Sequence, residues 1–241
     1  MKNFIKRNDF IIRTYSFVYN LIGLSRARVR GKKNAIKKGI IFQKKTRIKV
    51  SGNNNLITLG NMSRFNNIDI RIVGNDNELT FSGRNNAFRS RVIIEGNLCR
   101  LYIGNSAHLN NLKIVVAGEK SELIINDESS FFGEALIACS EGTKIAIGKD
   151  CMFSNNIIIR TMDAHPIIDE KGKRINHSQD VIIGDHVWIG DHAILNKGAC
   201  IPDNSIVGSG AVVTKKYDQP GVIIAGNPAR IVKTNINWLR K

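Results

Sequence analysis

Apolar residues return along the chain with a period of 22 residues. The lanes are Ile57, Leu79, Leu101, Leu123 and Ile145; then Leu59, Phe81, Ile103, Ile125 and Ile147; then Ile70, Val92, Ile114, Leu136 and Ile158. Gly52, Gly74, Gly96 and Gly118 keep the same spacing. Within each unit, short apolar pieces of two-residue period indicate strands, and Asn, Gly and Asp mark turns between them.

Downstream the period shortens to six residues. Positions 183, 189, 195, 201, 207 and 213 are all aliphatic, and a smaller residue follows four places after each of the first five: Val187, Ala193, Ala199, Ser205 and Ala211. Three such hexapeptides make one turn of a triangular coil, and the 22-residue units are coils of 18 with about four extra residues at one corner. Each coil buries its aliphatic residues only by stacking on its neighbours.

The fold class that this pattern predicts is all-β, a parallel β-solenoid of triangular section. A helical array is the alternative, and the frequent Asn, Gly and Asp exclude it because helices tolerate them poorly. We divide the chain into a basic, partly helical N-terminal segment (1–49), a solenoid domain (50–233) and a short C-terminal tail (234–241).

The lanes stop between Ile159 and Val181. The sequence there, TMDAHPIIDEKGKRINHSQD, is polar and charged, and it predicts a loop (161–180) that leaves the solenoid. Functional residues concentrate on loops of this kind. His165 precedes Pro166, which biases its backbone to an extended form. A histidine titrates near neutral pH and suits a general base.

The segments TMDAHPIID, IGDHVWIGDHAIL, VGSGAVVTK and IIAGNPARIVK resemble the left-handed β-helix, or hexapeptide-repeat, acyltransferases. Within that family they resemble the galactoside, maltose and xenobiotic acetyltransferases and the capsule and lipopolysaccharide O-acetyltransferases. The resemblance is close over 161–233 and only architectural over 50–160. It implies a left-handed coil, an acetyl-CoA co-substrate and His165 as the general base that takes a proton from a sugar hydroxyl.

The same resemblance implies coenzyme contacts on the last coils. They are Asp191, Ser209, Thr214, Lys215, Arg230 and Lys233. It also implies a homotrimer with active sites between subunits, and it places Trp188 near the acyl or acceptor end, with a packed corner aromatic as the alternative. Asp163 and Arg174 are candidate acceptor contacts in the loop, and each is equally well explained as a solvated loop charge.

The chemistry has alternatives. N-acetylation of an amino sugar is the nearest one, and a solenoid that serves only as a scaffold is the alternative from another class. A metal site is not expected: His186 and His192 lie six residues apart, at equivalent places on successive faces, so they do not converge. Cys99, Cys139, Cys151 and Cys200 show no C-x-x-C spacing and read as reduced thiols of a cytoplasmic protein.

Positive charge is concentrated at the N-terminal end. The net charge is +16, and residues 1–50 contain 15 Lys and Arg against one acid, Asp9. An apolar stretch beside a polybasic run suits contact with an anionic membrane at the inner face of a bacterial envelope. A helix that caps the open end of the solenoid is an equally good interpretation. Nucleic acid is not expected, because no recognition fold accompanies the charge.

Overall fold

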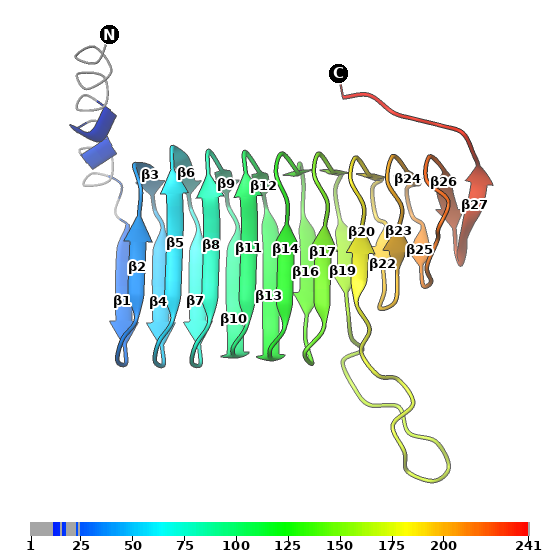
Figure 1. Cartoon of the computed structure of the whole chain (residues 1–241), viewed down its shortest axis with the longest axis horizontal. Coiled ribbons are helices and arrows are strands. Elements are labelled where there is room, and N and C mark those ends of the chain that lie inside the picture. Colours follow the sequence, from blue (N-terminus) through cyan, green and yellow to red (C-terminus); the bar gives the residue numbers. More distant parts are fainter. Residues whose placement is uncertain (1–11, 15, 18–22, 24, 241) are drawn as a thin grey trace.

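The structure is a computed structural model that describes residues 12–14, 16, 17, 23 and 25–240. Over these ranges the chain winds into a long solenoid whose strands form three sheets of nine, eight and ten strands. Figure 1 shows the coils stacked along one axis, with a loop extending away from the solenoid at one edge. All strand pairs are parallel except the last, β26 with β27.

The first eight coils contribute one strand to each sheet, and the last coil contributes strands to sheets A and C. Sheet A contains β1 (Arg26–Arg30), β4 (Arg47–Ser51), β7 (Asp69–Val73), β10 (Arg91–Asn97), β13 (Leu112–Glu119), β16 (Ala135–Cys139), β19 (Ile157–Arg160), β22 (Ile194–Leu195) and β25 (Val212–Val213). Sheet B contains β2 (Ala35–Lys38), β5 (Leu56–Asn61), β8 (Glu78–Gly83), β11 (Arg100–Asn105), β14 (Glu122–Ile125), β17 (Lys144–Ile147), β20 (Val181–Ile183) and β23 (Cys200–Ile201). Sheet C contains β3 (Ile41–Lys44), β6 (Ser63–Asn66), β9 (Asn86–Phe88), β12 (His108–Asn110), β15 (Ser130–Phe131), β18 (Met152–Phe153), β21 (Trp188–Ile189), β24 (Ile206–Val207), β26 (Ile223–Gly226) and β27 (Ala229–Lys233).

The predicted fold class, an all-β parallel solenoid, is confirmed. Two of the three 22-residue lanes stack in register across sheet B, as in the pairing of Ile57 with Leu79 and of Leu59 with Phe81. Their side chains are 1% exposed or less, and so is the hexapeptide lane from Ile189 to Val213. Alternate residues therefore point into one continuous core along the axis.

The third lane slips by one residue, so its prediction is wrong beyond Ile114. Leu112 pairs with Ala135, which makes that step one residue longer than 22, and Ile114 then pairs with Ile137. Ile137 and Ile159 fill the core in the places predicted for Leu136 and Ile158. Because side chains alternate between the two faces of a strand, the single extra residue turns Leu136 and Ile158 outward.

The solenoid begins inside the segment predicted as separate. Strands start at Arg26, before the boundary at residue 50, and Ile48 and Val50 already belong to the core. The 22-residue period does not reveal the first coil, because that coil contains one residue fewer. Arg26 pairs with Arg47, and Ile36 pairs with Ile57. Cations at its outward positions also obscure the alternation.

Little of the segment before Arg26 falls within the described residues. Residues 12–14, 16 and 17 are helical, and Ser16 is buried with its hydroxyl donating a hydrogen bond to the Ile41 carbonyl. This contact places Ser16 against the first coil, as the capping interpretation expects. The rest of the predicted membrane-contacting stretch, residues 1–11 in particular, lies outside the described residues. In the described part of the chain no helix is long and apolar enough to span a membrane.

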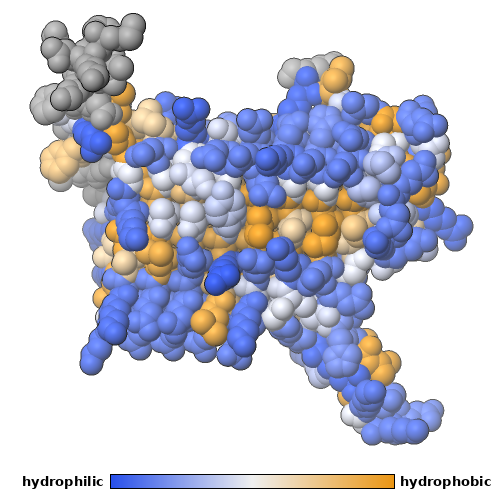
Figure 2. All heavy atoms as spheres, viewed as in Figure 1, coloured by the Kyte–Doolittle hydropathy of each residue, from blue (hydrophilic) through white to orange (hydrophobic). Residues whose placement is uncertain are grey.

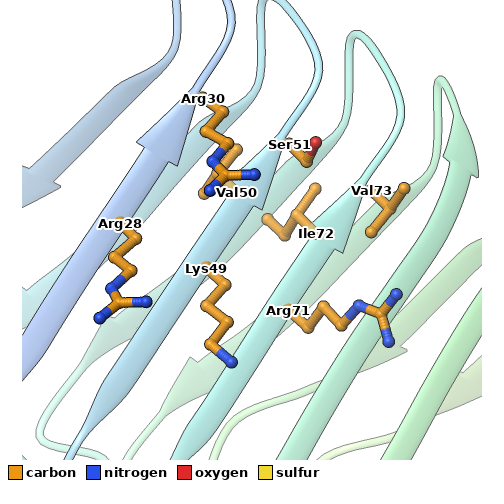
Figure 3. Close-up of a pocket in the computed structure, with 8 residues that line it drawn as sticks. All are labelled: Arg28, Arg30, Lys49, Val50, Ser51, Arg71, Ile72 and Val73. Atoms are coloured by element: carbon orange, nitrogen blue, oxygen red, sulfur yellow. The ribbon is translucent and has the colours of Figure 1, made fainter.

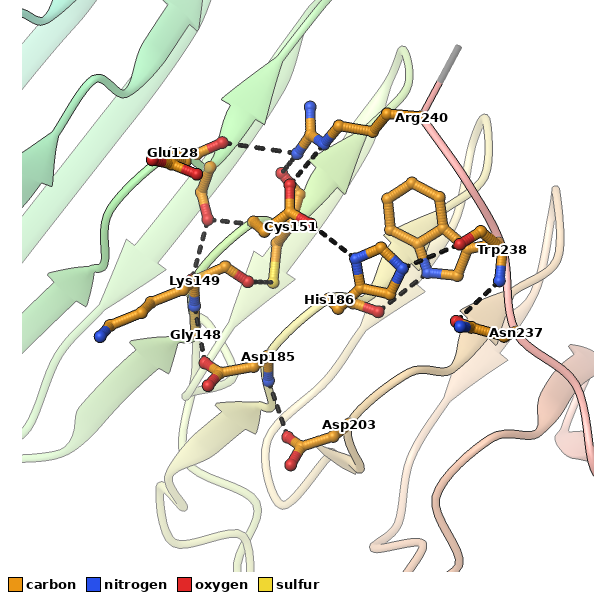
Figure 4. Close-up of polar contacts among 12 residues, drawn as sticks. Glu128, Gly148, Lys149, Cys151, Asp185, His186, Asp203, Asn237, Trp238 and Arg240 are labelled. Atoms are coloured by element: carbon orange, nitrogen blue, oxygen red, sulfur yellow. Dashed lines mark hydrogen bonds and ion pairs between the residues drawn. The ribbon is translucent and has the colours of Figure 1, made fainter.

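The C-terminal tail runs back over the solenoid (Figure 1) and is fixed by one cluster of contacts (Figure 4). His186 stacks on the Trp238 indole with ring centroids 4.1 Å apart, and its Nδ1 lies 2.6 Å from the Asp150 carboxylate. Arg240 contacts the same carboxylate at 2.6 Å and donates to the Cys151 carbonyl at 2.8 Å. The tail therefore ties the ends of three consecutive coils together, and His186 serves that contact.

Candidate functional site

The loop at 161–180 leaves the solenoid where sheet A meets sheet B, between β19 and β20 (Figure 1). The Gln179 amide donates to the Thr161 carbonyl at 3.0 Å, which closes the base of the loop. Further out, the Ile175 amide donates to the Ile167 carbonyl at 2.8 Å, so the tip is a short hairpin. The predicted excursion is thus an ordered element with its own backbone hydrogen bonds.

Asn176 organises the inside of this loop. Its side-chain nitrogen donates to the Asp163 carboxylate at 2.9 Å and to the His165 carbonyl at 2.8 Å, and its side-chain oxygen accepts from the Ile167 amide at 2.7 Å. The side chain is buried although the loop projects into solvent. Asn176 therefore holds the backbone on both sides of His165. Sequence reasoning did not single it out, because one asparagine in a polar loop carries no distinctive pattern.

Two ion pairs brace the loop against the coils on either side. Lys197 lies 2.5 Å from Asp163, and Arg174 lies 2.9 Å from Glu141. The hydrogen bond from Lys197, and then that from Asn176, hold the pKa of Asp163 below its ordinary value. Ser178 and Arg174 lower the pKa of Glu141 in the same way. Asp163 and Arg174 thus have partners within the chain, and their predicted acceptor contacts stay a prediction.

The His165 imidazole is exposed, and it makes no hydrogen bond within the described part of the chain. Its backbone is fixed by Asn176 while its ring nitrogens are available. The nearby apolar side chains of Ile167, Ile168 and Ile175 are 55–62% exposed, so the loop presents apolar surface beside the histidine. An available imidazole on a fixed backbone can accept a proton from a bound alcohol.

The predicted coenzyme contacts lie on the last coils but not on one side of them. Asp191 and Ser209 occupy successive corners between sheets C and A, and Thr214 and Lys215 follow β25 at the end of sheet A. Arg230 and Lys233 lie on β27 of sheet C. The Asp191 carboxylate accepts the Asn155 amide at 2.7 Å, which binds it to the preceding coil. Asp185 and Asp203 accept backbone amides in the same way at the corners between sheets B and C, so part of the role of Asp191 is structural.

Trp188 and His165 lie on opposite sides of the solenoid. Trp188 points outward from sheet C, where its indole N–H donates to Ser154 at 3.2 Å. The loop with His165 leaves the corner between sheets A and B, which a triangular coil places across from sheet C. One chain therefore does not bring these two residues together. A site that contains both takes them from two chains.

Known proteins share part of this sequence and most of this architecture. No family model matches the chain. Polysialic acid O-acetyltransferases are 41% identical to it over 98 residues in Escherichia coli O1:K1 and over 103 residues in Neisseria meningitidis. These matches cover 40% and 42% of this chain, and they span only 31% and 48% of the two relatives.

Solved structures match over far more of the length. The polysialic acid O-acetyltransferase OatWY aligns with a TM-score of 0.65 and 34% identity, covering 90% of this chain and 92% of that one. The polysialic acid specific acetyltransferase NeuO aligns with a TM-score of 0.63 and 27% identity, covering 90% and 89%. The likeness therefore includes the 22-residue coils as well as the hexapeptide coils.

A triangular parallel solenoid with hexapeptide coils and a histidine-bearing loop at one corner defines the class of hexapeptide-repeat acyltransferases. Within that class, the chain belongs to the left-handed β-helix acetyltransferase family that contains OatWY. The resemblance read from the sequence is thereby confirmed.

Proposed function

We propose that the protein is an acetyl-CoA-dependent O-acetyltransferase that acts on a hydroxyl group of a bacterial polysaccharide, with lipopolysaccharide and lipid-linked precursors as the related acceptors. The observation that carries the proposal is the likeness to OatWY over 90% of the chain at 34% identity. The two curated relatives with the same printed activity support it, although the matches span less than half of their length.

In this proposal His165 is the general base. Its imidazole takes the proton of the sugar hydroxyl as the oxygen attacks the thioester carbonyl of acetyl-CoA. The carbon–sulfur bond then breaks, the acetyl group stays on the sugar oxygen, and the coenzyme leaves as a thiolate that receives the proton from the imidazolium. Asn176 supports this role by fixing the His165 carbonyl at 2.8 Å. Backbone N–H groups are the candidate donors to the oxyanion.

The coenzyme is proposed to lie along the last coils. Its phosphates suit Lys215, Arg230 and Lys233, which are exposed cations, and arginine is well shaped for phosphate. Ser209 and Thr214 offer exposed hydroxyl groups on the same coils. For Asp191, whose Oδ1 is already bonded to the Asn155 amide, the contact is proposed through the other carboxylate oxygen.

The assembly is proposed to be a homotrimer with each site between two chains. Sheet A presents outward a half-buried apolar lane of Leu136, Ile158, Ile194 and Val212, which pair in register. Sheet B carries a second outward apolar row, of Ile124, Ala146 and Ile182 in register, and Figure 2 shows apolar side chains gathered along the middle of the face over that sheet. Outward apolar surface of this extent indicates a protein partner. A second copy also supplies a way to unite His165 with Trp188, as proposed for the acyl or acceptor end.

The location of the protein and the alternatives to O-acetylation complete the proposal. The four cysteines are free thiols in the structure, three of them buried, which fits a cytoplasmic protein. Contact with the inner face of an anionic membrane is proposed only through residues 1–49. N-acetylation of an amino sugar uses the same base and differs only in the attacking atom. A scaffold without catalysis is the contrasting candidate.

The first experiment follows thiol release from acetyl-CoA with polysialic acid and other envelope polysaccharides as acceptors. His165→Ala is expected to lower kcat/KM by about 100- to 10,000-fold, the usual contribution of a general base. His108→Ala is the matched control, because His108 is an exposed histidine on sheet C with no part in the proposed site.

Each result decides a separate point. Equal rates in the parent and His165→Ala would remove the histidine from the mechanism but leave the activity standing. Release that needs an amino sugar and gives an amide product would replace O- by N-acetylation. No release with any acceptor, together with no calorimetric binding of coenzyme A, would favour the scaffold.

A further inference from the structure

The first coils carry a strip of positive charge on the outward side of sheet A. Six cations from three adjacent strands are exposed on this side. They are Arg26, Arg28 and Arg30 of β1, Arg47 and Lys49 of β4, and Arg71 of β7. We call these six residues the basic face. All six are exposed, and apart from the pairing of Arg71 with Glu95 at 3.6 Å none of them makes an ion pair within the described part of the chain.

The basic face includes a shallow pocket of about 390 Å³. Arg28, Lys49 and Arg71 line it from three adjacent strands, and Figure 3 shows their side chains standing side by side across the sheet. Adjacent strands lie about 4.8 Å apart, so the three cations form a row with that spacing. Like charges placed opposite one another in a sheet repel. A bound row of anions would remove that repulsion.

The row points toward the proposed active site. Along sheet A, Arg71 is followed in register by Ile93, Val115, Ala138 and then Arg160. Arg160 is the last residue of β19, directly before the loop that bears His165. Six strand steps separate β1 from β19, which is about 29 Å. Cations thus lie at both ends of one lane, with apolar side chains between them.

We propose that the acceptor is an anionic polysaccharide and that it lies along sheet A, with its carboxylate groups on the basic face and its acetylated sugar at the loop. This inference rests on the proposed function and extends it to the charge and length of the acceptor. A ligand that reaches from Arg28 to the loop is an extended chain of several sugars. The apolar side chains between the cations can pack against the carbon faces of the sugar rings. On β16 and β19 this lane lies two residues nearer the loop than Leu136 and Ile158, which the proposed trimer covers.

The shape of the charged surface favours this ligand over the membrane contact proposed above for residues 1–49, to which five of the six residues of the basic face belong. The cations continue along the solenoid axis in line with the loop, which suits a linear polymer, whereas a bilayer has no reason to follow one lane of a sheet. The relatives act, by their printed names, on polysialic acid, in which every sugar carries a carboxylate. Polysialic acid is therefore the probe to use.

The test compares two triple variants that lose the same charge. Arg28→Gln, Lys49→Gln and Arg71→Gln remove the central row of the basic face. The control, Lys37→Gln, Arg64→Gln and Arg100→Gln, removes three exposed cations from sheets B and C, on the first, second and fourth coils. Acetylation of long polysialic acid and of a short sialic acid oligomer is measured at several salt concentrations, and binding of fluorescent polysialic acid is measured separately. Thermal unfolding confirms that both variants fold.

The row variant is expected to raise KM for the long polymer at least tenfold at low salt, with kcat changed less than twofold. Its logarithmic salt dependence should also fall, because fewer counterions are released on binding. The control should behave like the parent protein, and the short oligomer should show a smaller difference among all three. An unchanged KM and an unchanged polymer affinity in the row variant would overturn the inference even if acetylation itself is observed.

Direct binding separates this inference from the proposed function. If no acceptor is acetylated but polysialic acid binds and the row variant loses that binding, the inference stands and the activity fails. Vesicles that contain about one third phosphatidylglycerol provide the competing surface. Strong binding of the parent protein to these vesicles through the same row, with no affinity for polysialic acid, would overturn the inference in favour of a membrane.

Discussion

Asparagine side chains hold the corners between sheets A and B, where the sequence suggests only turns. The amide of Asn77 accepts from the Cys99 amide at 2.9 Å, donates to the Gly96 carbonyl at 2.8 Å and donates to Asn55 at 3.0 Å. Asn55 repeats these contacts one coil earlier. A buried ladder of amides therefore satisfies the backbone of successive corners. Residues that look like loop composition are part of the packed interior.

This ladder predicts a large effect for Asn77→Ala. The side chain is 1% exposed, and its loss leaves the buried Cys99 N–H without this acceptor and removes a donor from the half-buried Gly96 carbonyl. We expect the free energy of unfolding to fall by about 2–4 kcal/mol, measured by urea denaturation.

Asn75→Ala is the matched control, because the Asn75 side chain donates to Asn97 and accepts from the Asn53 amide in a parallel ladder that water reaches. Its loss should cost less than about 1 kcal/mol. Equal effects of the two substitutions would show that burial of the ladder does not determine its contribution.

At the scale of elements, the loop at 161–180 is held by groups on the coils before and after it. Asp163 meets Lys197, Arg174 meets Glu141, and Asn176 links the two halves of the loop. The two anchors, Glu141 and Lys197, lie on the coils before and after that of the loop, so the loop depends on the stacking of the solenoid. That arrangement suits an element that must keep His165 at one place while extending into solvent.

The pH dependence of the loop follows from its carboxylates. The pKa values of Asp163 and Glu141 are lowered from 3.8 and 4.5. Each group is ionised when paired, so its contribution to the order of the loop is complete above those ordinary values and is lost as pH falls through the lowered ones. Protection of the Ile167 and Ile175 amides from hydrogen exchange, corrected for intrinsic rates, should persist at pH 5 and decline below about 3.8.

Two variants sharpen this measurement. Asp163→Asn should weaken protection of the loop already at pH 7, whereas Glu170→Gln, at the exposed tip, should leave it unchanged. Loss of protection near pH 6 in the parent protein would point instead to a histidine as the controlling group.

Elements with a repeated pattern could be predicted from the sequence, and their contacts could not. The 22- and six-residue periods predict the strands and the excursion at 161–180, since only stacked coils bury such lanes. The shift of one residue at Leu136 could not be predicted from the sequence, because one extra residue at a corner leaves the apolar composition unchanged. It nevertheless exchanges the side chains that point into the core with those that point outward. The role of Asn176 could not be predicted either, because it arises from a hairpin that no local pattern predicts.

At the scale of the whole molecule, the outward surface changes along the axis. Sheet A begins with the basic face and ends with the apolar lane that contains Ile158 and Ile194. Sheet B also becomes apolar, through Ile124, Ala146 and Ile182 in register. Both apolar surfaces flank the corner from which the loop leaves. The predicted site residues are spread over several sides of one chain for this reason: a single sequence cannot show which sides meet in an assembly.

The apolar lane predicts the assembly. Ile194→Asp should reduce the mass measured by light scattering from that of a trimer to that of a monomer, because a carboxylate would be buried without a partner in the interface. Asn86→Asp, an outward position on sheet C with the same added charge, is the control and should leave the trimer intact. A parent protein that is monomeric at micromolar concentration would contradict the proposed trimer.

The register of the 22-residue coils also makes the solenoid a molecular ruler. Asp69 pairs with Arg91, Leu79 with Leu101 and Phe65 with Ala87, so the same step separates neighbours in all three sheets. Duplication of residues 91–112, the coil that follows the basic face, would insert one further rung and preserve every ladder on either side. The distance between the basic face and His165 would grow by about 4.8 Å, the spacing of one strand. Coil number is thus a heritable unit of length, by which tandem duplication or deletion can reset the span of ligand that the protein measures without altering either end.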